Sequence, residues 1–277
     1  MKVGMLTSPF ADEPLVKVLD FAESLSISCL EIAARPGSRH LDPAKLTAAH
    51  AREIRQAVSD RGLEISALAY YTCDITKPRL TQAVQAQAIR TIDAAARLDV
   101  DTVCMLCGFP AEGMSKFETI ARVLPKAFKP ILAHARKKKV RIALENWYAT
   151  CLQGLDTFEA LFEAIPDEHF GLNYDPSHLF HQECDHLLPI RLYKDRLFHT
   201  HAKDTLIDRA KRAQSGIYAS GWWRYVIPGF GNINWGEYVS HLRANGYDGV
   251  LSIEHEDHTQ TREEGFMRGA WFLEQFC

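Results

Sequence analysis

Short runs of apolar, β-forming residues alternate with longer amphipathic stretches along the whole chain. The runs expected to be strands are residues 2–6, 29–32, 64–69, 102–106, 141–145, 171–174, 197–201 and 249–254. The stretches expected to be helices are residues 14–24, 43–61, 79–98, 117–138, 157–164, 184–193, 235–245 and 262–276. Alternation of this kind is typical of a parallel sheet whose strands are joined by helices. Because there are eight such units, the sequence predicts an α/β fold, a closed (β/α)8 TIM barrel.

Local signals inside these elements agree with a barrel. Residues 102–106 are apolar at consecutive positions, as expected of a parallel strand that is covered on both faces. Asp42 and Pro43 resemble a helix N-cap followed by a first-turn proline, and Gly62 follows the helix that it would end. No linker or low-complexity tract interrupts the sequence. We therefore expect a single domain over residues 1–277.

One connection is much longer than the others. It runs from about residue 203 to about residue 233, between the strand 197–201 and the helix 235–245. Loops of this length inside compact domains are usually functional. The segment leaves its strand at the carboxyl end, where barrel enzymes carry their active sites. The sequence therefore predicts a long active-site loop that forms a lid or a pocket wall.

Composition restricts the partners and the compartment. The 277 residues carry a formal net charge of -3 at pH 7, which offers no basic surface to nucleic acid or to an anionic membrane. The seven cysteines are scattered and lie mostly in apolar segments, as in proteins of a reducing compartment. The apolar run at the amino terminus is too short for a signal peptide, and no window suits a membrane span. We expect a cytoplasmic protein with a small-molecule partner.

Four of the expected strands end in residue types that bind metals. Glu145, Asp175, His201 and Glu254 each close a short apolar run. Because the carboxyl ends of barrel strands meet at one face, these side chains should converge there. Three carboxylates and one imidazole suit Mn²⁺, Mg²⁺, Co²⁺ or Zn²⁺, and no thiolate accompanies them as in structural zinc sites. A single acidic strand end is often solvated or caps a helix, but four together favour a metal site.

The sequence around these residues carries five motifs. They are Ala-Leu-Glu-Asn at 143–146, Asn-Tyr-Asp-Pro-Ser-His at 173–178, His-Thr-His-Ala-Lys-Asp at 199–204, Ile-Pro-Gly-Phe-Gly-Asn-Ile-Asn-Trp at 227–235 and Gly-Tyr-Asp-Gly-Val-Leu-Ser-Ile-Glu-His-Glu-Asp at 246–257. Together they resemble the sugar phosphate isomerase/epimerase family of xylose isomerase-like TIM barrels, which includes ketose 3-epimerases, hydroxypyruvate isomerases and inosose dehydratases. The resemblance covers most of the carboxyl-terminal half, whereas the amino-terminal half shares only the strand–helix rhythm.

This resemblance implies a metal centre and a substrate class. One divalent metal ion, with Mn²⁺ preferred over Mg²⁺, Co²⁺ or Zn²⁺, would be bound by Glu145, Asp175, His201 and Glu254. The substrate would be a ketose or a related keto-sugar, chelated through its carbonyl oxygen and a neighbouring hydroxyl. The protein would form a homodimer or a homotetramer.

The same resemblance implies an isomerase or epimerase mechanism. Glu145 and Glu254 would be the acid/base pair as well as metal ligands. One would remove the proton next to the carbonyl, leaving a metal-stabilised cis-enediolate, and the other would return a proton. Return to the opposite face gives epimerisation, and return to the neighbouring carbon gives isomerisation.

Three other functions are weighed against this one. A metal-dependent lyase, a dehydratase or 3-keto-glycoside eliminase, begins with the same proton abstraction and is the main alternative. An abasic-site endonuclease would need further metal ligands and a basic face, which the net charge argues against. A binding protein on the same fold would have no use for two acid/base glutamates, although fold never determines function.

Two residues near the four strand ends are candidates for substrate binding. His178 matches the family's histidine for a substrate oxygen, or it orients Asp175 by a hydrogen bond. Lys203 could pair with a substrate oxygen or with the enolate, or form a salt bridge with Asp204 or Glu256. We expect His199, two residues before His201, to lie on the opposite side of the strand and to pack in the core.

The long segment supplies further candidates. Trp222 and Trp223 could stack on the apolar faces of a sugar, and Arg224 could bind hydroxyls or a phosphate. Aromatic pairs in loops also form subunit contacts. Gly229 and Gly231 come before a helix, but bulky residues flank them, so a phosphate-binding turn is not indicated. A non-phosphorylated substrate is favoured.

Overall fold

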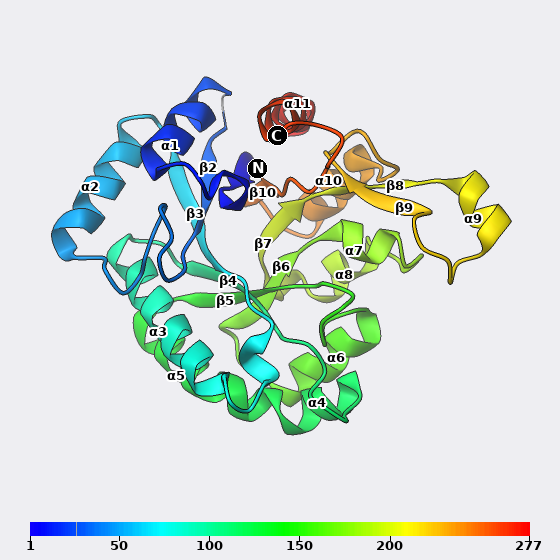
Figure 1. Ribbon diagram of the computed structural model, residues 1–277, viewed down its shortest axis with the longest axis horizontal. Helices are drawn as coiled ribbons and strands as arrows, with labels where there is room; N and C mark the ends of the chain where they lie inside the picture. Colours follow the sequence, from blue (N-terminus) through cyan, green and yellow to red (C-terminus); the bar gives the residue numbers. More distant parts are fainter. Residues whose placement is uncertain (26) are drawn as a thin grey trace.

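A computed structural model describes residues 1–25 and 27–277 of the chain. Within this part, eight parallel strands form one closed barrel in the order β1-β10-β7-β6-β5-β4-β3-β2 (Figure 1). The barrel strands are β1 (Lys2–Leu6), β2 (Cys29–Ala33), β3 (Glu64–Tyr70), β4 (Thr102–Leu106), β5 (Arg141–Glu145), β6 (Phe170–Tyr174), β7 (Leu197–Ala202) and β10 (Val250–Ile253). Each predicted strand is present, with its ends within one residue of the prediction. The predicted (β/α)8 barrel is therefore confirmed.

Helices cover the outside of the barrel. They are η1 (Ser8–Phe10), α1 (Leu15–Ser24), α2 (Ala48–Ser59), η2 (Asp74–Thr76), α3 (Thr81–Arg97), α4 (Lys116–Arg122), α5 (Leu124–Lys138), α6 (Leu155–Ala164), α7 (Pro176–Phe180), α8 (Leu188–Leu192), η3 (Lys194–Arg196), α10 (Trp235–Ala244) and α11 (Arg262–Glu274). The ring closes where Phe21 of α1 packs against Phe266 of α11, with ring centroids 6.5 Å apart. No helix within residues 1–25 and 27–277 is both long and apolar enough to cross a membrane.

The helical predictions were less accurate than the strand predictions. The predicted helix 117–138 is two helices, α4 and α5, which meet at Val123. Ser115 and Glu118 form a capping box at the start of α4, and Pro125 lies in the first turn of α5, where the missing N–H is not needed. Other predicted ends were also wrong: α2 begins at Ala48 rather than at residue 43, α8 is shorter than the predicted 184–193, and α7 was not predicted.

The long connection after β7 is a hairpin with its own helix. β8 (Asp204–Ile207) pairs antiparallel with β9 (Trp223–Val226), and α9 (Arg209–Ser215) lies between them. Figure 1 shows this hairpin in yellow, projecting from the rim of the barrel. The segment predicted as a long loop therefore contains two short paired strands and a helix that were not predicted.

A buried carboxylate fastens the base of the hairpin, where it joins the barrel. Asp204 accepts hydrogen bonds from the backbone N–H groups of Gly229, Gly231 and Ile233 at 3.1–3.2 Å, and from Trp235 Nε1 at 2.9 Å. A side chain at Gly231 would collide with this carboxylate, since an added Cβ would lie 2.2 Å from Asp204 Oδ1. The glycines noted in the sequence therefore surround the protein's own carboxylate, and these donors are not available for a phosphate.

Gly171 shows how tightly neighbouring strands approach. An added Cβ would lie 2.3 Å from the backbone oxygen of Arg196, which cannot rotate away. We expect Gly171→Ala to lower the free energy of unfolding by about 1–3 kcal/mol, the usual cost of overpacking. Gly236→Ala, whose Cβ would meet its nearest atom at 3.5 Å, should be neutral or slightly stabilising. Urea denaturation of both variants measures the difference, and equal midpoints would contradict the close approach.

Candidate metal centre

The four residues predicted from strand ends lie together in the structure. Glu145 ends β5, Asp175 follows β6, His201 lies in β7 and Glu254 follows β10. These strands are consecutive neighbours in the barrel. One potential ligand atom from each residue lies within 4.8 Å of those from the other three. The carboxyl ends of four adjacent strands thus form one compact group of three carboxylates and an imidazole.

Local hydrogen bonds hold Asp175 in place. The Asn146 side chain accepts a hydrogen bond from the Asp175 backbone N–H and donates one to its carbonyl oxygen, each at 2.8 Å. Asp175 Oδ1 accepts from the backbone N–H of Ser177 at 2.8 Å and so caps the amino terminus of α7. Because one oxygen is used by the helix, the other, Oδ2, is free to face the group.

Two atoms of the group fit a cation. Asp175 Oδ2 and His201 Nδ1 are buried and make no hydrogen bond within residues 1–25 and 27–277, although Lys203 Nζ lies 3.2 Å from the first and Glu254 Oε2 lies 3.1 Å from the second. Buried polar atoms almost always have a partner, so each such exception calls for an explanation. Carboxylate oxygens and imidazole nitrogen are ligands of Mn²⁺, Mg²⁺, Co²⁺ and Zn²⁺. The residues present therefore fit a divalent metal ion, held by Glu145, Asp175, His201 and Glu254.

Lys203 places a cation among the same carboxylates. Its Nζ lies 2.6 Å from Glu254 Oε2, 3.1 Å from Glu256 Oε2 and 3.2 Å from Asp175 Oδ2, and its side chain is 1% exposed. Burial alone would lower the pKa of the Lys203 ammonium, but the surrounding carboxylates raise it well above its ordinary value. The anticipated ion pair with Glu256 is present, whereas Asp204 is used by the hairpin.

The two glutamates differ in acidity. Burial raises the pKa of Glu145, but the neighbouring His178 and His201 side chains and the Lys203 ammonium outweigh it and hold the pKa well below its ordinary value. Burial also raises the pKa of Glu254, and the neighbouring Glu145 raises it further, above its ordinary value. The environments of these two carboxyls therefore separate their pKa values, as is common for an acid and a base in one site.

His178 lies at the edge of the group, where the sequence placed it. Its Nε2 is 3.2 Å from Glu145 Oε1 and 3.5 Å from Asp175 Oδ2. Its Nδ1 is 2.6 Å from the hydroxyl of Tyr225, which comes from β9. Tyr225 follows Arg224 on the long segment, and its contact with His178 was not predicted. The hairpin thus contacts the candidate centre directly.

Of the other candidates on the hairpin, Trp223 and Arg224 lie next to the centre and Trp222 does not. Trp223 stacks on His181, with ring centroids 3.9 Å apart, and Arg224 pairs with Asp257 at 2.7 Å. Both line a cavity of about 380 Å³ next to the centre, together with Tyr225, Glu256, His258 and Thr259. Trp222 is buried, donates to the Ile217 carbonyl oxygen at 3.1 Å and packs beside Arg212. The structure does not bring Trp222 to the centre, because its indole packs against the segment between β8 and β9 instead.

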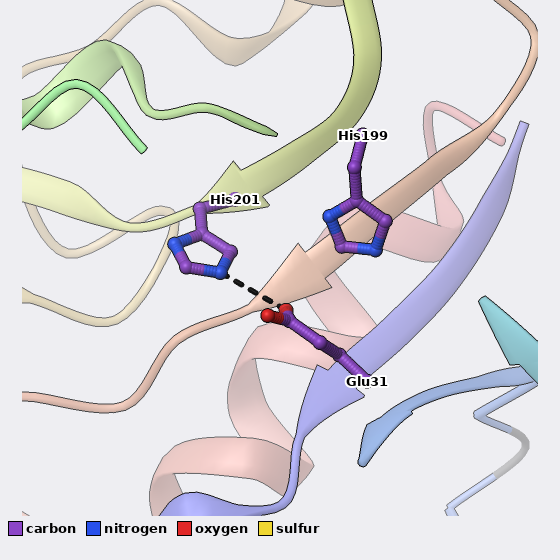
Figure 2. A group of neighbouring side chains, drawn as sticks. All are labelled: Glu31, His199 and His201. Atoms are coloured by element: carbon purple, nitrogen blue, oxygen red, sulfur yellow. Dashed lines mark hydrogen bonds and ion pairs between the residues drawn. The ribbon is translucent and has the colours of Figure 1, made fainter. Parts of the chain in front are cut away.

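The prediction for His199 was wrong in its direction. His199 and His201 lie on the same side of β7, with ring centroids 6.2 Å apart, and both point toward Glu31 (Figure 2). Residues two apart in a strand face the same side, so the expectation of opposite sides misapplied the strand period. His199 is nevertheless buried, as expected, and both ring nitrogens have hydrogen-bond partners, Asn173 and Ser66.

The fold and the site define a (β/α)8-barrel protein with a candidate metal centre at the carboxyl ends of its strands. The model of the family described as "Xylose isomerase-like TIM barrel" matches residues 19–276, so the chain belongs to this family. Members of this enzyme superfamily include isomerases, epimerases and dehydratases.

Two sequence relatives illustrate the range of the family. The chain is 28% identical over 310 residues to the uncharacterized protein YfiH of Bacillus subtilis, covering 99% of each chain. It is 26% identical over 137 residues to the inosose dehydratase of Clostridium tetani, covering 48% of this chain and 46% of that enzyme. The second match therefore spans about half of the dehydratase.

Two solved structures share the fold. The protein IolI, with a bound zinc atom, is 16% identical with a TM-score of 0.77, over 100% of this chain and 98% of that chain. The 3-keto-D-glucoside 4-epimerase YcjR of Escherichia coli is 15% identical with a TM-score of 0.75, over 99% of each chain. At these identities the likeness concerns the fold alone.

Proposed function

We propose that this protein is a divalent-metal-dependent sugar isomerase or epimerase that acts on a ketose or a related keto-sugar. The observation that carries the proposal is the group of four potential ligand atoms within 4.8 Å of one another, two of them from glutamates. When bound there, a metal ion would polarise the substrate carbonyl and stabilise the negative charge that develops on it. The remaining chemistry is the transfer of one proton by the protein's side chains.

Glu145 and Glu254 are the proposed acid/base pair. Either glutamate can act as the base while the other acts as the acid, because both carboxyls lie in the same buried group. The base removes the proton from the carbon beside the carbonyl, which leaves a cis-enediolate of the substrate. The acid returns a proton to the opposite face of that carbon in an epimerase, or to the neighbouring carbon in an isomerase.

Other residues hold the substrate in this proposal. His178 and Lys203 are polar, buried and adjacent to the glutamates, so they can bind substrate oxygens. Trp223 and Arg224 line the neighbouring cavity. Two features support a non-phosphorylated substrate: the backbone donors near Gly229 are used by Asp204, and Arg224 is paired with Asp257. The negative charge of the carboxylates around Lys203 would also repel a phosphate.

A dehydratase is the second candidate, favoured by the similarity to inosose dehydratases. In this reaction the same base removes the same proton, and the enolate then expels a β-hydroxyl group as water. An acid close to that hydroxyl is required, and His178, 3.2 Å from Glu145, could provide it. The two candidates share the metal centre and differ in the fate of the enolate.

Metal identity, location and assembly are also proposals. We propose Mn²⁺ as the native ion because the site offers three carboxylates and one imidazole. The seven free cysteines support a reducing, cytoplasmic location. A homodimer or homotetramer is proposed from the resemblance alone.

Proton NMR in D₂O tests the function. The chelated protein, reloaded with diamagnetic Mg²⁺ or Zn²⁺, is incubated with a panel of free ketoses, keto-sugars and inososes. An isomerase or epimerase should replace one C–H signal by deuterium and give a sugar with the same atoms. Loss of water from the substrate would favour the dehydratase. If no member of the panel exchanged a proton or formed a product with either ion, the proposal would be rejected.

A further inference from the structure

A second group of polar side chains lies inside the barrel, beneath His201. Its centre is Glu31 of β2, which is fully buried. Glu31 Oε2 accepts hydrogen bonds from His201 Nε2 and Ser252 Oγ, each at 3.0 Å, and Oε1 accepts one from the Tyr71 hydroxyl. Figure 2 shows Glu31 meeting His201 across the barrel from β2. The mechanism proposed above does not use Glu31.

The direction of every hydrogen bond in this group follows from Glu31. An ionised carboxylate only accepts, so Tyr71 donates its proton to Glu31 and must accept from Asn173 Nδ2, 2.9 Å away. This fixes the Asn173 amide, whose Oδ1 then accepts from His199 Nδ1 at 2.9 Å. His199 Nε2 in turn accepts from Ser66 Oγ at 3.1 Å. The chain of donors and acceptors is consistent from Ser66 to Glu31.

Glu31 also determines which ring nitrogen of His201 carries the hydrogen. Its Nε2 faces Glu31, the Tyr71 oxygen at 3.1 Å and Asn173 Nδ2 at 3.0 Å. Because the ionised Glu31 carboxylate can only accept, its 3.0 Å contact with Nε2 requires a hydrogen on Nε2, which is donated to Glu31. In the neutral ring the other nitrogen, Nδ1, then has a free lone pair. Nδ1 faces the candidate metal ligands and lies 3.1 Å from Glu254 Oε2.

Two irregularities in the strand pairing place these side chains. Along β2 and β3, Leu30 pairs with Ile65 but Glu31 pairs with Ala67, which leaves Ser66 as an extra residue. Along β6 and β7, Leu172 pairs with Leu197 but Asn173 pairs with His199, which leaves Phe198 as an extra residue. β-Bulges redirect side chains and are common next to active sites. Both shifts lie beside members of the group under His201.

Glu31, His199 and His201 have metal-binding residue types, but they do not suit a second metal ion. Their potential ligand atoms also lie within 4.8 Å of one another. However, both ring nitrogens of His199 already have hydrogen-bond partners, and His201 Nε2 directs a hydrogen at Glu31. A ligand needs a free lone pair directed at the ion. The group is therefore better explained by a role in support of His201.

We propose that Glu31 is a positioning residue for the metal centre: it holds His201 with its hydrogen on Nε2, so that Nδ1 is the atom that binds the metal. This inference rests on the proposed metal-dependent function. Metal-binding histidines commonly donate their other ring N–H to a carboxylate, which fixes the ring and increases its basicity. Here the carboxylate comes from β2, on the far side of the barrel from Glu145.

Zinc affinity tests the inference without an activity assay. Isothermal titration calorimetry of the chelated full-length protein gives the Zn²⁺ dissociation constant. We expect Glu31→Gln to raise it about 10–100-fold, as for other carboxylates that support a ligating histidine. Tyr71→Phe, which removes one donor to Glu31, should raise it less. Ser66→Ala, at the far end of the same group, is the matched control and should stay within about threefold of wild type.

NMR adds a readout that a purely structural role would not change. In ¹⁵N-histidine-labelled, Zn²⁺-loaded protein, two-bond ¹H–¹⁵N correlations distinguish the protonated ring nitrogen from the metal-bound one. The signals of His201 are identified by their absence from His201→Asn. We expect a protonated Nε2 and a metal-bound Nδ1. The opposite assignment would overturn the inference.

The outcomes separate this inference from the proposed function. If wild-type protein binds no Zn²⁺ and none of the other proposed ions, the metal centre and the role of Glu31 both fail. If wild type binds Zn²⁺ and Glu31→Gln binds it equally well, only the role of Glu31 is wrong. Should Glu31→Gln not fold, Tyr71→Phe decides, and wild-type affinity in that variant would count against the inference.

Discussion

Glu145→Gln and Glu254→Gln should each lose about 10²–10⁴-fold in turnover of the substrate found in the D₂O experiment, the usual contribution of a general acid or base. Glutamine keeps the shape of each side chain but cannot take up or release a proton at neutral pH. Both residues belong to the same group of potential ligands. The pKa of Glu145 is lowered and that of Glu254 is raised by their surroundings. Steady-state rates of the metal-saturated variants measure the effect.

The controls separate proton transfer from metal loss. Metal content is measured for each variant, because either substitution also removes a charged ligand. Glu64→Gln is the matched control, since Glu64 begins β3 at the opposite end of the barrel and pairs with Lys2. It should retain wild-type turnover. If Glu145→Gln or Glu254→Gln kept near wild-type turnover with metal bound, its assignment as acid or base would be wrong.

The fold could be predicted from sequence because the barrel strands are buried on both faces. β4 and β5, apolar at most consecutive positions, were predicted with their observed ends. Helix ends depended on weaker signals, and the break at Val123 was missed because the amphipathic pattern continues from α4 into α5. The hairpin was missed for a different reason. Its strands are only four residues long and pair with each other, and such a pairing across α9 leaves little local signal.

The candidate centre was partly predictable for a geometric reason. Strand ends of a parallel barrel converge, so Glu145, Asp175, His201 and Glu254 could be grouped without knowing distances. The contact of Tyr225 with His178 and that of Glu31 with His201 could not be predicted in this way. Glu31 is 170 positions from His201 in the sequence, and only the closed barrel brings the side chains of β2 and β7 together. The sequence offered one signal, the acidic residue Glu31 inside an apolar strand, but this signal did not identify His201 as its partner.

Lys203→Met should destabilise the metal-free protein by about 3–5 kcal/mol, because it removes the cation from a buried ionic group. Glu145, Asp175, Glu254 and Glu256 all have an oxygen within 4.0 Å of the Lys203 ammonium. Without it, their negative charges would repel one another in a site shielded from water. We expect a melting temperature roughly 10 °C lower than that of chelated wild type. Differential scanning calorimetry in the presence of a chelator measures the two melting temperatures.

The same variant connects stability to the metal centre. A divalent ion supplies positive charge to carboxylates that Lys203 neutralises, so Mn²⁺ or Zn²⁺ should raise the melting temperature of Lys203→Met more than that of wild type. Lys116→Met is the matched control: Lys116 donates to the Tyr148 carbonyl and to Gln153, which are neutral, and its loss should not change the response to metal. Lowering the pH should reduce the difference in melting temperature between chelated wild type and chelated Lys203→Met, since protonation of the carboxylates removes the charges that repel one another. A chelated Lys203→Met protein as stable as wild type would show that the carboxylates do not depend on this lysine.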